Sequence, residues 1–431
     1  MKQKELLYFV AFVIFLIGVG LLQSWNVAFG ILNMCLISAI MALGVNIQWG
    51  YAGLFNAGIM GFVALGGLSA VLVSAEPVGE AWSNGGIGIV ASLTILVITI
   101  AMIFYVQKMF ASPLRLWIII MVILLGYWLF QGLFSPAVEQ IESFNPAFAG
   151  YLGGLGLPIT LSWIIGGLVA AGGAWLIGRI SLGLRADYLA IATLGISEII
   201  IAIIKYEEWL TRGVKNVTGL PRPVPYEINL VETHWFVDLA ETINANPIAM
   251  ASLFVKFCYF GLFLGVLAIL MWFSERALKS PWGRMMRAIR DNRDAASAMG
   301  KDITSRHLQT FILGCAVCGI AGAMLVTLDG QLVPGSYTPL RYTFLIWVMV
   351  ILGGSGNNWG SILGGCIIWF LWIQAEPLGY VLVGFITFPF EDNHWLKNHL
   401  VENAAQTRLI LMGAILLMVM RFAPKGLIPE R

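Results

Sequence analysis

The sequence has few charged residues. Only 11% of its 431 residues are Asp, Glu, Lys or Arg, whereas soluble domains carry about 25%. The hydrophobic share is 59% and the mean hydropathy is +0.85. This composition excludes an ordinary soluble protein and predicts an integral membrane protein. The formal net charge of +2 gives no sign of a nucleic-acid partner.

The chain also lacks the motifs of nucleotide, metal and covalent chemistry. It contains no phosphate loop of the form GxxxxGK[ST], because Gly300-Lys301 is followed by Asp302. The four histidines show no metal-ligand spacing. Cys315 and Cys318 form a CxxC, but it lies in an apolar run, where thiols act as small packing side chains. We therefore expect no metal, no cofactor and no catalytic site; a membrane redox enzyme would depend on the CxxC alone.

Apolar runs long enough to cross a bilayer recur along the chain. A hydrocarbon core of about 30 Å needs about 20 apolar residues in one helix. Runs near or above that length are 6–22, 27–47, 54–74, 86–106, 114–135, 151–178, 188–204, 255–273, 308–328 and 408–422, with shorter pieces between 342 and 388. They predict an all-α polytopic membrane protein, one domain over residues 1–431 with about 10–12 transmembrane helices. No small-residue cleavage site follows residue 22, so we expect the first helix to be retained.

The charges of the short loops predict the topology. Loops 75–85 and 136–150 carry Glu and no basic residue, whereas loops 107–116 and 179–187 carry Lys or Arg. Because basic loops face the cytoplasm, both termini are predicted to be cytoplasmic and the number of crossings to be even. Residues 205–254, with six acidic and four basic residues, then form a periplasmic loop.

Residues 279–306 concentrate positive charge on the predicted cytoplasmic side. Seven Lys or Arg and three Asp fall within these residues. The segment after Pro281 favours a helix, in which Arg287 with Asp291 and Arg290 with Asp294 are opposite charges at i,i+4. Positive charge on a helix between two membrane helices predicts a contact with something outside the membrane.

The same segment has an apolar face. Met286, Ile289, Ala296 and Met299 recur on roughly one side of the expected helix, and Gly300 suits its end. Such a short amphipathic helix suits the docking of a soluble protein. The alternative is a solvated loop that only fixes topology.

Two glycine-rich stretches interrupt the apolar pattern. Residues 342–352 form a helix of about 16 Å, too short to span a bilayer alone. They run into GGSGNNWG at 353–360, where the chain either turns back or continues as a broken helix. A similar stretch occurs at 48–67. Paired interruptions are typical of translocation paths in transporters with repeats, although glycine also allows close helix packing. The path candidates are Asn56, Gly353, Gly354 and Gly356.

Glu198 is the one acid well inside a strong apolar run. A charge near the centre of a membrane helix costs about 2.5–3.5 kcal/mol on insertion scales, so it should face the bundle interior, a partner or water. It either lines a path or bridges two helices as a protonated acid. Small residues between 314 and 323 form a face on which another backbone can pack closely.

Four motifs, in order over about 310 residues, carry a resemblance to a known family. They are GYAGLFNAGIMGF (50–62), DYLAIATLGISEII (187–200), RAIRDNRDAASAMGKDITSRHLQTFILGCAVCGIAGAM (287–324) and VILGGSGNNWGSILGG (350–365). The chain resembles the permeases of branched-chain amino acid ABC importers. It is more similar to the longer, M-type subunit of the Liv-type systems than to the shorter H-type subunit.

The resemblance implies a type II ABC importer fold. This chain would be one permease of a heterodimer, with the translocation path at the subunit interface. Two cytoplasmic ATPase subunits would bind Mg-ATP, and a periplasmic binding protein would deliver the substrate. Glu198 falls on the family's Glu, which favours a functional role. The residues placed in or near the ATPase-coupling segment are Arg287, Arg290, Asp294, Ala295, Ala296 and Gly300.

The outer loop departs from the family pattern. Arg212 and Lys215 stand where small residues are usual, in TRGVKNVTGLPRPVP at 211–225. With Arg222, they are candidates for contact with the binding protein, and their charge would change partner complementarity.

The sequence therefore predicts a permease subunit in the bacterial inner membrane that imports branched-chain or related amino acids. The alternative cargo is urea or a short amide. The alternative class is an ion-coupled secondary transporter acting alone, which would need several buried acids and no basic docking loop.

Overall fold

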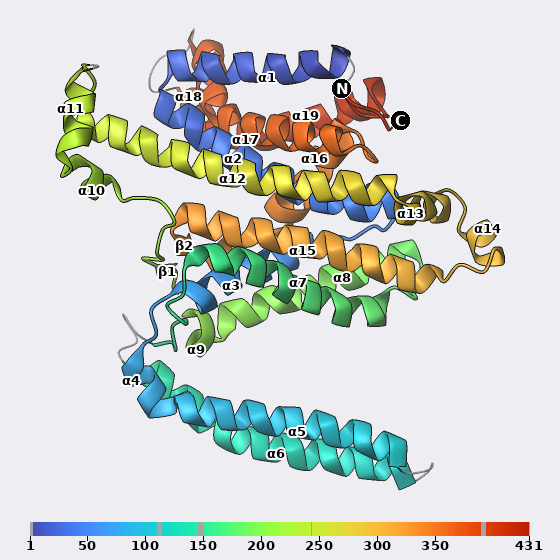
Figure 1. The fold of residues 1–431 in the computed structure, drawn as a ribbon. Helices are drawn as coiled ribbons and strands as arrows, with labels where there is room; N and C mark the ends of the chain where they lie inside the picture. Colours follow the sequence, from blue (N-terminus) through green and yellow to red (C-terminus); the bar gives the residue numbers. More distant parts are fainter. Residues whose placement is uncertain (1–2, 110–113, 145–149, 243, 389–393, 431) are drawn as a thin grey trace.

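The computed structural model describes all residues except 1–2, 110–113, 145–149, 243, 389–393 and 431. The described chain is almost entirely helical, with long helices lying side by side (Figure 1). A two-stranded antiparallel sheet joins β1 (Val217–Thr218) to β2 (Gln331–Leu332). The predicted all-α polytopic membrane fold is confirmed.

Ten helices of the described chain are long and apolar enough to cross a membrane, which agrees with the predicted number of about 10–12. They are α1 (Gln3–Leu22), α2 (Trp25–Val45), α5 (Ile87–Met109), α6 (Leu114–Ser143), α7 (Ile159–Ser181), α8 (Ala186–Tyr206), α12 (Pro247–Lys279), α15 (Ile303–Asp329), α17 (Asn358–Thr387) and α19 (Thr407–Phe422). Short π or 3-10 turns extend three of them: η1 (Asn46–Gly50) after α2, η2 (Trp82–Gly86) with α4 (Gly79–Ala81) before α5, and η5 (Ala404–Gln406) before α19.

Two apolar helices are shorter. α3 (Ile59–Ser74) begins five residues later than the predicted run 54–74, because the chain from residue 53 to residue 58 is irregular. The second is η4 (Leu340–Phe344) continued by α16 (Leu345–Gly353). Both lie in the core of the bundle.

Small residues set the spacing of the central helices α2, α3, α7 and α15. A Cβ built on Gly66 of α3 would lie 1.9 Å from the carbonyl oxygen of Gly319 on α15. On Gly322 it would lie 2.0 Å from the carbonyl oxygen of Val63. The predicted small-residue face between 314 and 323 is therefore a helix-packing surface.

The chain turns back at the second glycine-rich stretch. α16 ends at Gly353, and α17 starts at Asn358 and returns along it. A Cβ on Gly364 would lie 1.9 Å from the carbonyl oxygen of Met349, so the two helices are in close contact. Of the two predicted alternatives, the structure has the turn.

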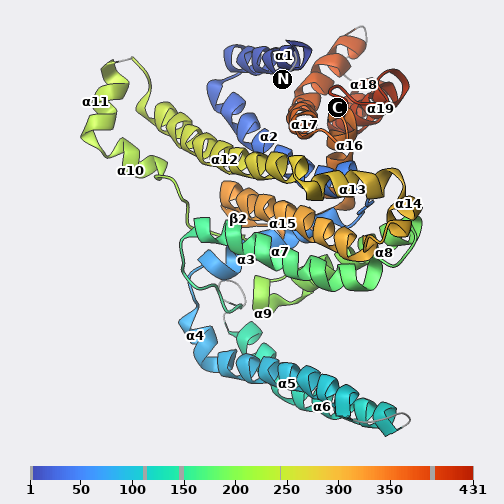
Figure 2. The ribbon, with the colours of Figure 1, turned by 45° about the vertical axis from the view of Figure 1, so that its right-hand side comes forward.

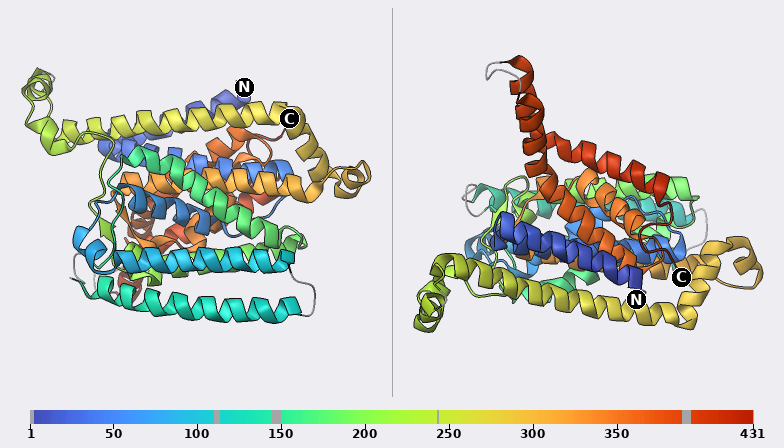
Figure 3. Two further views of the ribbon diagram at one scale, coloured as in Figure 1. Left: turned by 60° about the horizontal axis from the view of Figure 1, so that its bottom comes forward. Right: turned by 90° about the horizontal axis from the view of Figure 1, so that it is seen from above.

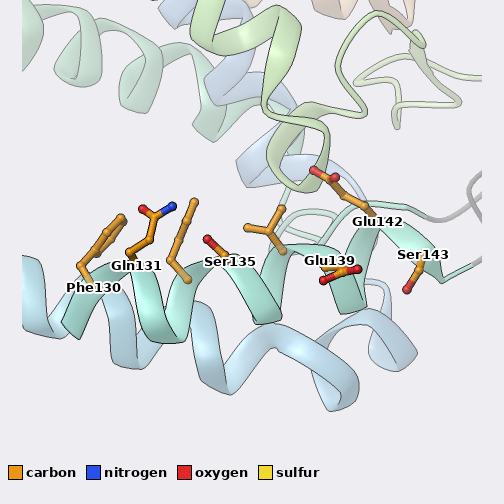
Figure 4. Close-up of a pocket in the computed structure, with 8 residues that line it drawn as sticks. Phe130, Gln131, Ser135, Glu139, Glu142 and Ser143 are labelled. Carbon is orange, nitrogen blue, oxygen red and sulfur yellow. The ribbon is translucent and has the colours of Figure 1, made fainter. Parts of the chain in front are cut away.

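α5 and α6 form a hairpin that stands apart from the rest (Figures 1 and 2). Its base is held by a small apolar cluster that includes Ile89 and Ile141, and by the backbone N–H of Trp209, which donates to Glu142 over 3.2 Å. A pocket of about 510 Å³ lies along α6, where Gln131, Ser135 and Glu142 point toward the bundle (Figure 4). Most other side chains of the hairpin are exposed, as expected for helices surrounded by lipid.

The remaining elements gather at the two ends of the bundle (Figure 3). α13 (Pro281–Asp291), α14 (Arg293–Ala298) and both termini share one end, as the predicted topology requires. α8 ends at Tyr206 and α12 begins at Pro247, so the predicted outer loop 205–254 is shortened to 207–246. At the other end lie α9 (Glu208–Thr211), α10 (Glu227–Val231), α11 (His234–Thr242), η3 (Pro334–Ser336) and α18 (Trp395–Glu402), together with β1 and β2.

Candidate coupling and translocation site

The basic segment folds as two short helices, not as one. Pro281 follows the N-cap Ser280 and begins α13, a position where its missing N–H costs nothing. Asn292 is extended, at φ −153°, and its side chain accepts the Ala295 N–H over 3.0 Å to cap α14. This break separates Arg290 from Asp294, and the expected ion pair between them does not form.

The apolar face of the segment is buried for three of its four predicted residues. Met286 and Ile289 are 0% and 2% exposed, and Ala296 is also buried. Met299 is 79% exposed, because it lies past the end of α14. Gly300 ends the helix as predicted: its φ is +73°, and the Lys301 N–H donates to the Ala296 carbonyl over 3.2 Å.

The outward surface of the segment is small and polar. Asp294, Ala295 and Gly300 are exposed, and a Cβ on Gly300 would meet nothing within 4 Å. Arg287 is half-buried and lines a pocket on the inner side of α13. The coupling candidates thus divide into the exposed Asp294, Ala295 and Gly300, the buried Ala296, and the two inward-facing arginines of α13.

Arg290 joins α13 to two other parts of the chain. Its Nη1 donates to the backbone carbonyl of Gly50 and lies 2.8 Å from a carboxylate oxygen of Glu430, while its Nε lies 3.1 Å from Asp291. Burial alone would lower the pKa of Arg290, but the hydrogen bonds and charges of Glu430 and Asp291 together raise it. The guanidinium therefore stays charged.

A buried polar cluster continues from Gly50 into the bundle. The Nδ2 of Asn46 donates to the Oδ1 of Asn358 over 3.0 Å, and the Oδ1 of Asn46 accepts the Gly356 N–H over 2.8 Å. Asn358 in turn accepts the Tyr51 hydroxyl over 3.1 Å and donates to Glu275 over 3.2 Å. The two predicted interruptions of the sequence are thus bonded directly to each other.

Gly353, Gly354 and Gly356 form the turn between α16 and α17. Gly354 has φ +113°, and a Cβ on it would lie 2.2 Å from the carbonyl oxygen of Ile428. The C-terminal tail packs on this turn, with the Ile428 N–H donating to the Gly353 carbonyl over 2.9 Å. The non-helical backbone is buried by protein at the α13 end of the bundle, one of the two environments in which such backbone is tolerated.

Asn56 holds the irregular segment that follows η1. It is 1% exposed; its Nδ2 donates to Gln48 over 3.0 Å, and its Oδ1 accepts the Gly58 N–H over 2.9 Å. The Trp347 indole N–H donates to its carbonyl over 3.0 Å, which ties the segment to α16. Cys315 also lies in this network, 3.3 Å from Gln48, as a free buried thiol.

Glu198 points away from the bundle. The opposite face of α8 packs on α3, where a Cβ on Gly61 would lie 2.7 Å from the Cβ of Ser197. Glu198 is exposed on the same face of α8 as Gly195 and Ile199. It forms no hydrogen bond or ion pair with the described residues. Of the predicted environments, the bundle interior is excluded for this chain, which leaves a partner or water.

The three basic residues of the outer loop have acidic or aromatic neighbours. Lys215 lies 2.9 Å from Glu208, and Arg222 lies 3.1 Å from Glu227. Arg212 adopts φ +60° and lies over the ring of Tyr151 at 5.9 Å. Carboxylates therefore balance the positive charges of Lys215 and Arg222 locally.

Comparison with known proteins agrees with this architecture. The family described as "Branched-chain amino acid transport system / permease component" matches residues 146–420, more than half of the chain. A probable branched-chain amino acid transport permease protein LivM of Methanocaldococcus jannaschii is 27% identical over 392 residues, covering 91% of this chain and 90% of that protein. The high-affinity LivM permease proteins of Salmonella typhimurium and Escherichia coli are each 24% identical over 347 residues, covering 78% of this chain and 74% of theirs. No solved structure matches the chain.

Proposed function

Because this chain belongs to the family of permease components of branched-chain amino acid transport systems, we propose that it is a membrane subunit of an ATP-driven importer of branched-chain amino acids. The observation that best supports this role is the position of Arg290. It connects a short helix outside the membrane to the interrupted segments inside the bundle.

Coupling would proceed through α13 and α14. One of the two ATPase subunits would contact the exposed surface of α14 around Asp294 and Ala295. Met286 and Ile289 of α13 are buried against the bundle. A displacement of α14 would therefore move α13 as one rigid helix. Arg290 would pass this movement to Gly50 and to the turn before α17, where the interrupted segments meet.

The second permease subunit would contact the outer face of α8. Glu198 is exposed there at membrane depth, where contact with lipid would be costly. A partner helix could approach closely at Gly195, where a Cβ would meet nothing within 4 Å. The translocation path would then lie between the two subunits, with Glu198 on its wall.

The opposite end of the bundle would receive the binding protein. Residues 207–246 provide a surface that includes Arg212, Lys215 and Arg222, the last two in ion pairs. In this orientation the chain lies in a bacterial inner membrane, with both termini and α13 on the cytoplasmic side.

The test is purification of the tagged chain from native membranes in mild detergent, followed by identification of its partners and an assay of ATP hydrolysis. We expect a second permease, two ATPase subunits and Mg-ATP turnover. Ala295→Trp should release the ATPases and retain the second permease, whereas the control Asn229→Trp, at the opposite end, should retain both.

Uptake into proteoliposomes then identifies the cargo. With the binding protein present, we expect leucine, isoleucine or valine to be imported in preference to urea. A chain that purifies alone and transports leucine on an ion gradient would contradict the proposal.

A further inference from the structure

An apolar groove of about 540 Å³ runs along the side of the bundle between α1, α2, α12 and α17. Its walls are apolar side chains, so water gains no hydrogen bonds inside it. Residues that line it include Phe9, Leu16, Leu36, Leu264, Met271 and Ile362.

The groove is about as long as one leaflet of a bilayer. On α12 it extends from Phe260 to Met271. At 1.5 Å per residue this stretch covers about 16 Å, close to half of the roughly 30 Å hydrocarbon core. A single acyl chain of a lipid therefore matches the groove in both polarity and length.

At the α13 end a polar pocket of about 330 Å³ adjoins the groove at Trp359. On α1, Glu5 of the pocket lies one helical turn before Phe9 of the groove. On α12, Glu275 of the pocket lies one turn after Met271 of the groove. Trp359 of α17 lines both. Three helices thus change from apolar to polar at one level, as lipid does between its acyl chain and headgroup.

Arg287 provides a binding group for a phosphate in this pocket. It is half-buried and forms no hydrogen bond or ion pair with the described residues. Lys279 lines the same pocket but lies 3.3 Å from Glu275. A planar guanidinium beside a headgroup-sized space suits bidentate binding of a phosphate.

The pocket also carries acidic side chains, which can lie beside a cationic group of a headgroup. Glu5, Glu275 and Glu430 line it together with the two basic residues. Glu275 lies 3.3 Å from Lys279, and Glu430 lies 2.8 Å from Arg290. A headgroup that carries an amine as well as a phosphate matches both signs of charge, because its amine can lie beside these carboxylates while Arg287 binds the phosphate.

We infer that this groove and pocket form a phospholipid site, in which the groove holds an acyl chain and Arg287 binds the phosphate of an amine-bearing headgroup. The inference depends on contacts within this chain and not on the transport proposal. It places a bound lipid beside α13, where the headgroup contacts the helix that also carries Arg290.

The test is native mass spectrometry of the full chain, as it purifies from membranes with or without partners, after exchange into detergent with equal amounts of phosphatidylethanolamine and phosphatidylglycerol. We expect one tightly held phosphatidylethanolamine per chain. Arg287→Gln removes a charge-assisted contact and should lower its occupancy about tenfold. Leu264→Trp, which fills the groove, should lower it to a similar extent.

Matched controls separate this site from lipid bound elsewhere. Arg284→Gln changes an exposed arginine of α13 outside the pocket, and Leu262→Trp changes a leucine of α12 outside the groove; both should retain the lipid. Equal lipid occupancy in Arg287→Gln and wild type would overturn the inference. Preferential retention of phosphatidylglycerol would do so as well.

Discussion

Arg290 connects α13, η1 and the C-terminal tail through one guanidinium group. Removing its charge while keeping a hydrogen-bonding side chain, as in Arg290→Gln, would leave Glu430 without its ionic partner. Hydrogen bonds to charged groups contribute about 1.5–3 kcal/mol each, so we expect uptake per ATP hydrolysed to fall at least about tenfold. The measurement is coupled uptake and hydrolysis in proteoliposomes, with membrane insertion checked by surface labelling.

A charge exchange provides the control. The double variant Arg290→Glu with Glu430→Arg restores an ion pair at the same place, and should recover part of the coupling that Arg290→Glu alone loses. Because Gly50 would still lack its donor, recovery should be incomplete. Equal coupling in wild type and Arg290→Gln would show that α13 communicates with the bundle by another route.

Glu198 gives a second prediction for a single side chain. If it lies on the wall of a path between two permease subunits, Glu198→Leu should lower uptake about tenfold and still copurify with the second subunit. Glu198→Gln removes the charge and keeps a hydrogen-bonding side chain. Its uptake should exceed that of Glu198→Leu only if the carboxylate acts as a hydrogen-bonding group. Ile199→Leu, beside it on the same face, is the control. Unchanged uptake in Glu198→Leu would exclude a role in transport.

The sequence did not predict the partners of Arg290. Arg290 and Asp294 have the spacing of a helical ion pair, but the partners observed are Asp291 and Glu430. Glu430 lies far along the chain, and only the folded tail brings it to α13. Asn292 was a usable local signal, since asparagine is among the strongest N-cap residues, and it would have predicted the break between α13 and α14.

Backbone geometry constrains the turn between α16 and α17. Gly354 combines φ +113° with a contact that leaves no space for a Cβ. Gly354→Ala should therefore destabilise the protein by about 1–3 kcal/mol, and displace the C-terminal tail from Gly353. Gly265→Ala is the control, because a Cβ there meets nothing within 4 Å and alanine is the better helix former. A melting temperature lowered by Gly354→Ala and not by Gly265→Ala is the expected result.

At the level of elements, hydrophobic run length predicted most membrane helices, because it reports burial in lipid directly. It failed for α3, whose first predicted residues form the irregular segment held by Asn56. It also left open whether residues 342–373 turn back, since apolar composition is the same in a hairpin and in a broken helix. Packing of Gly364 on α16 decided that question.

For the whole molecule, the sequence predicted a polytopic bundle with α13 and both termini at one end, and the structure agrees. It did not predict that α5 and α6 stand apart as a hairpin. Apolar helices surrounded by lipid and apolar helices packed in a bundle have similar composition, because lipid and protein interior are both apolar. Composition therefore predicts that these helices lie in the membrane but not that they leave the bundle.

The two ends of the bundle provide a test of orientation. Ser297 on α14 and Asn229 on α10 are exposed at opposite ends. In a chain whose five native cysteines are replaced by alanine, Ser297→Cys should react with a membrane-impermeant maleimide only in inverted vesicles, and Asn229→Cys only in intact cells whose outer barrier has been opened. The positive-inside rule requires this result, because the basic segment 279–306 follows α12 directly. Labelling of both cysteines from the same side of the membrane would contradict the fold. If the two labelling patterns were exchanged, the fold would stand, but α13 would lie outside the cell, where cytoplasmic ATPases could not reach it.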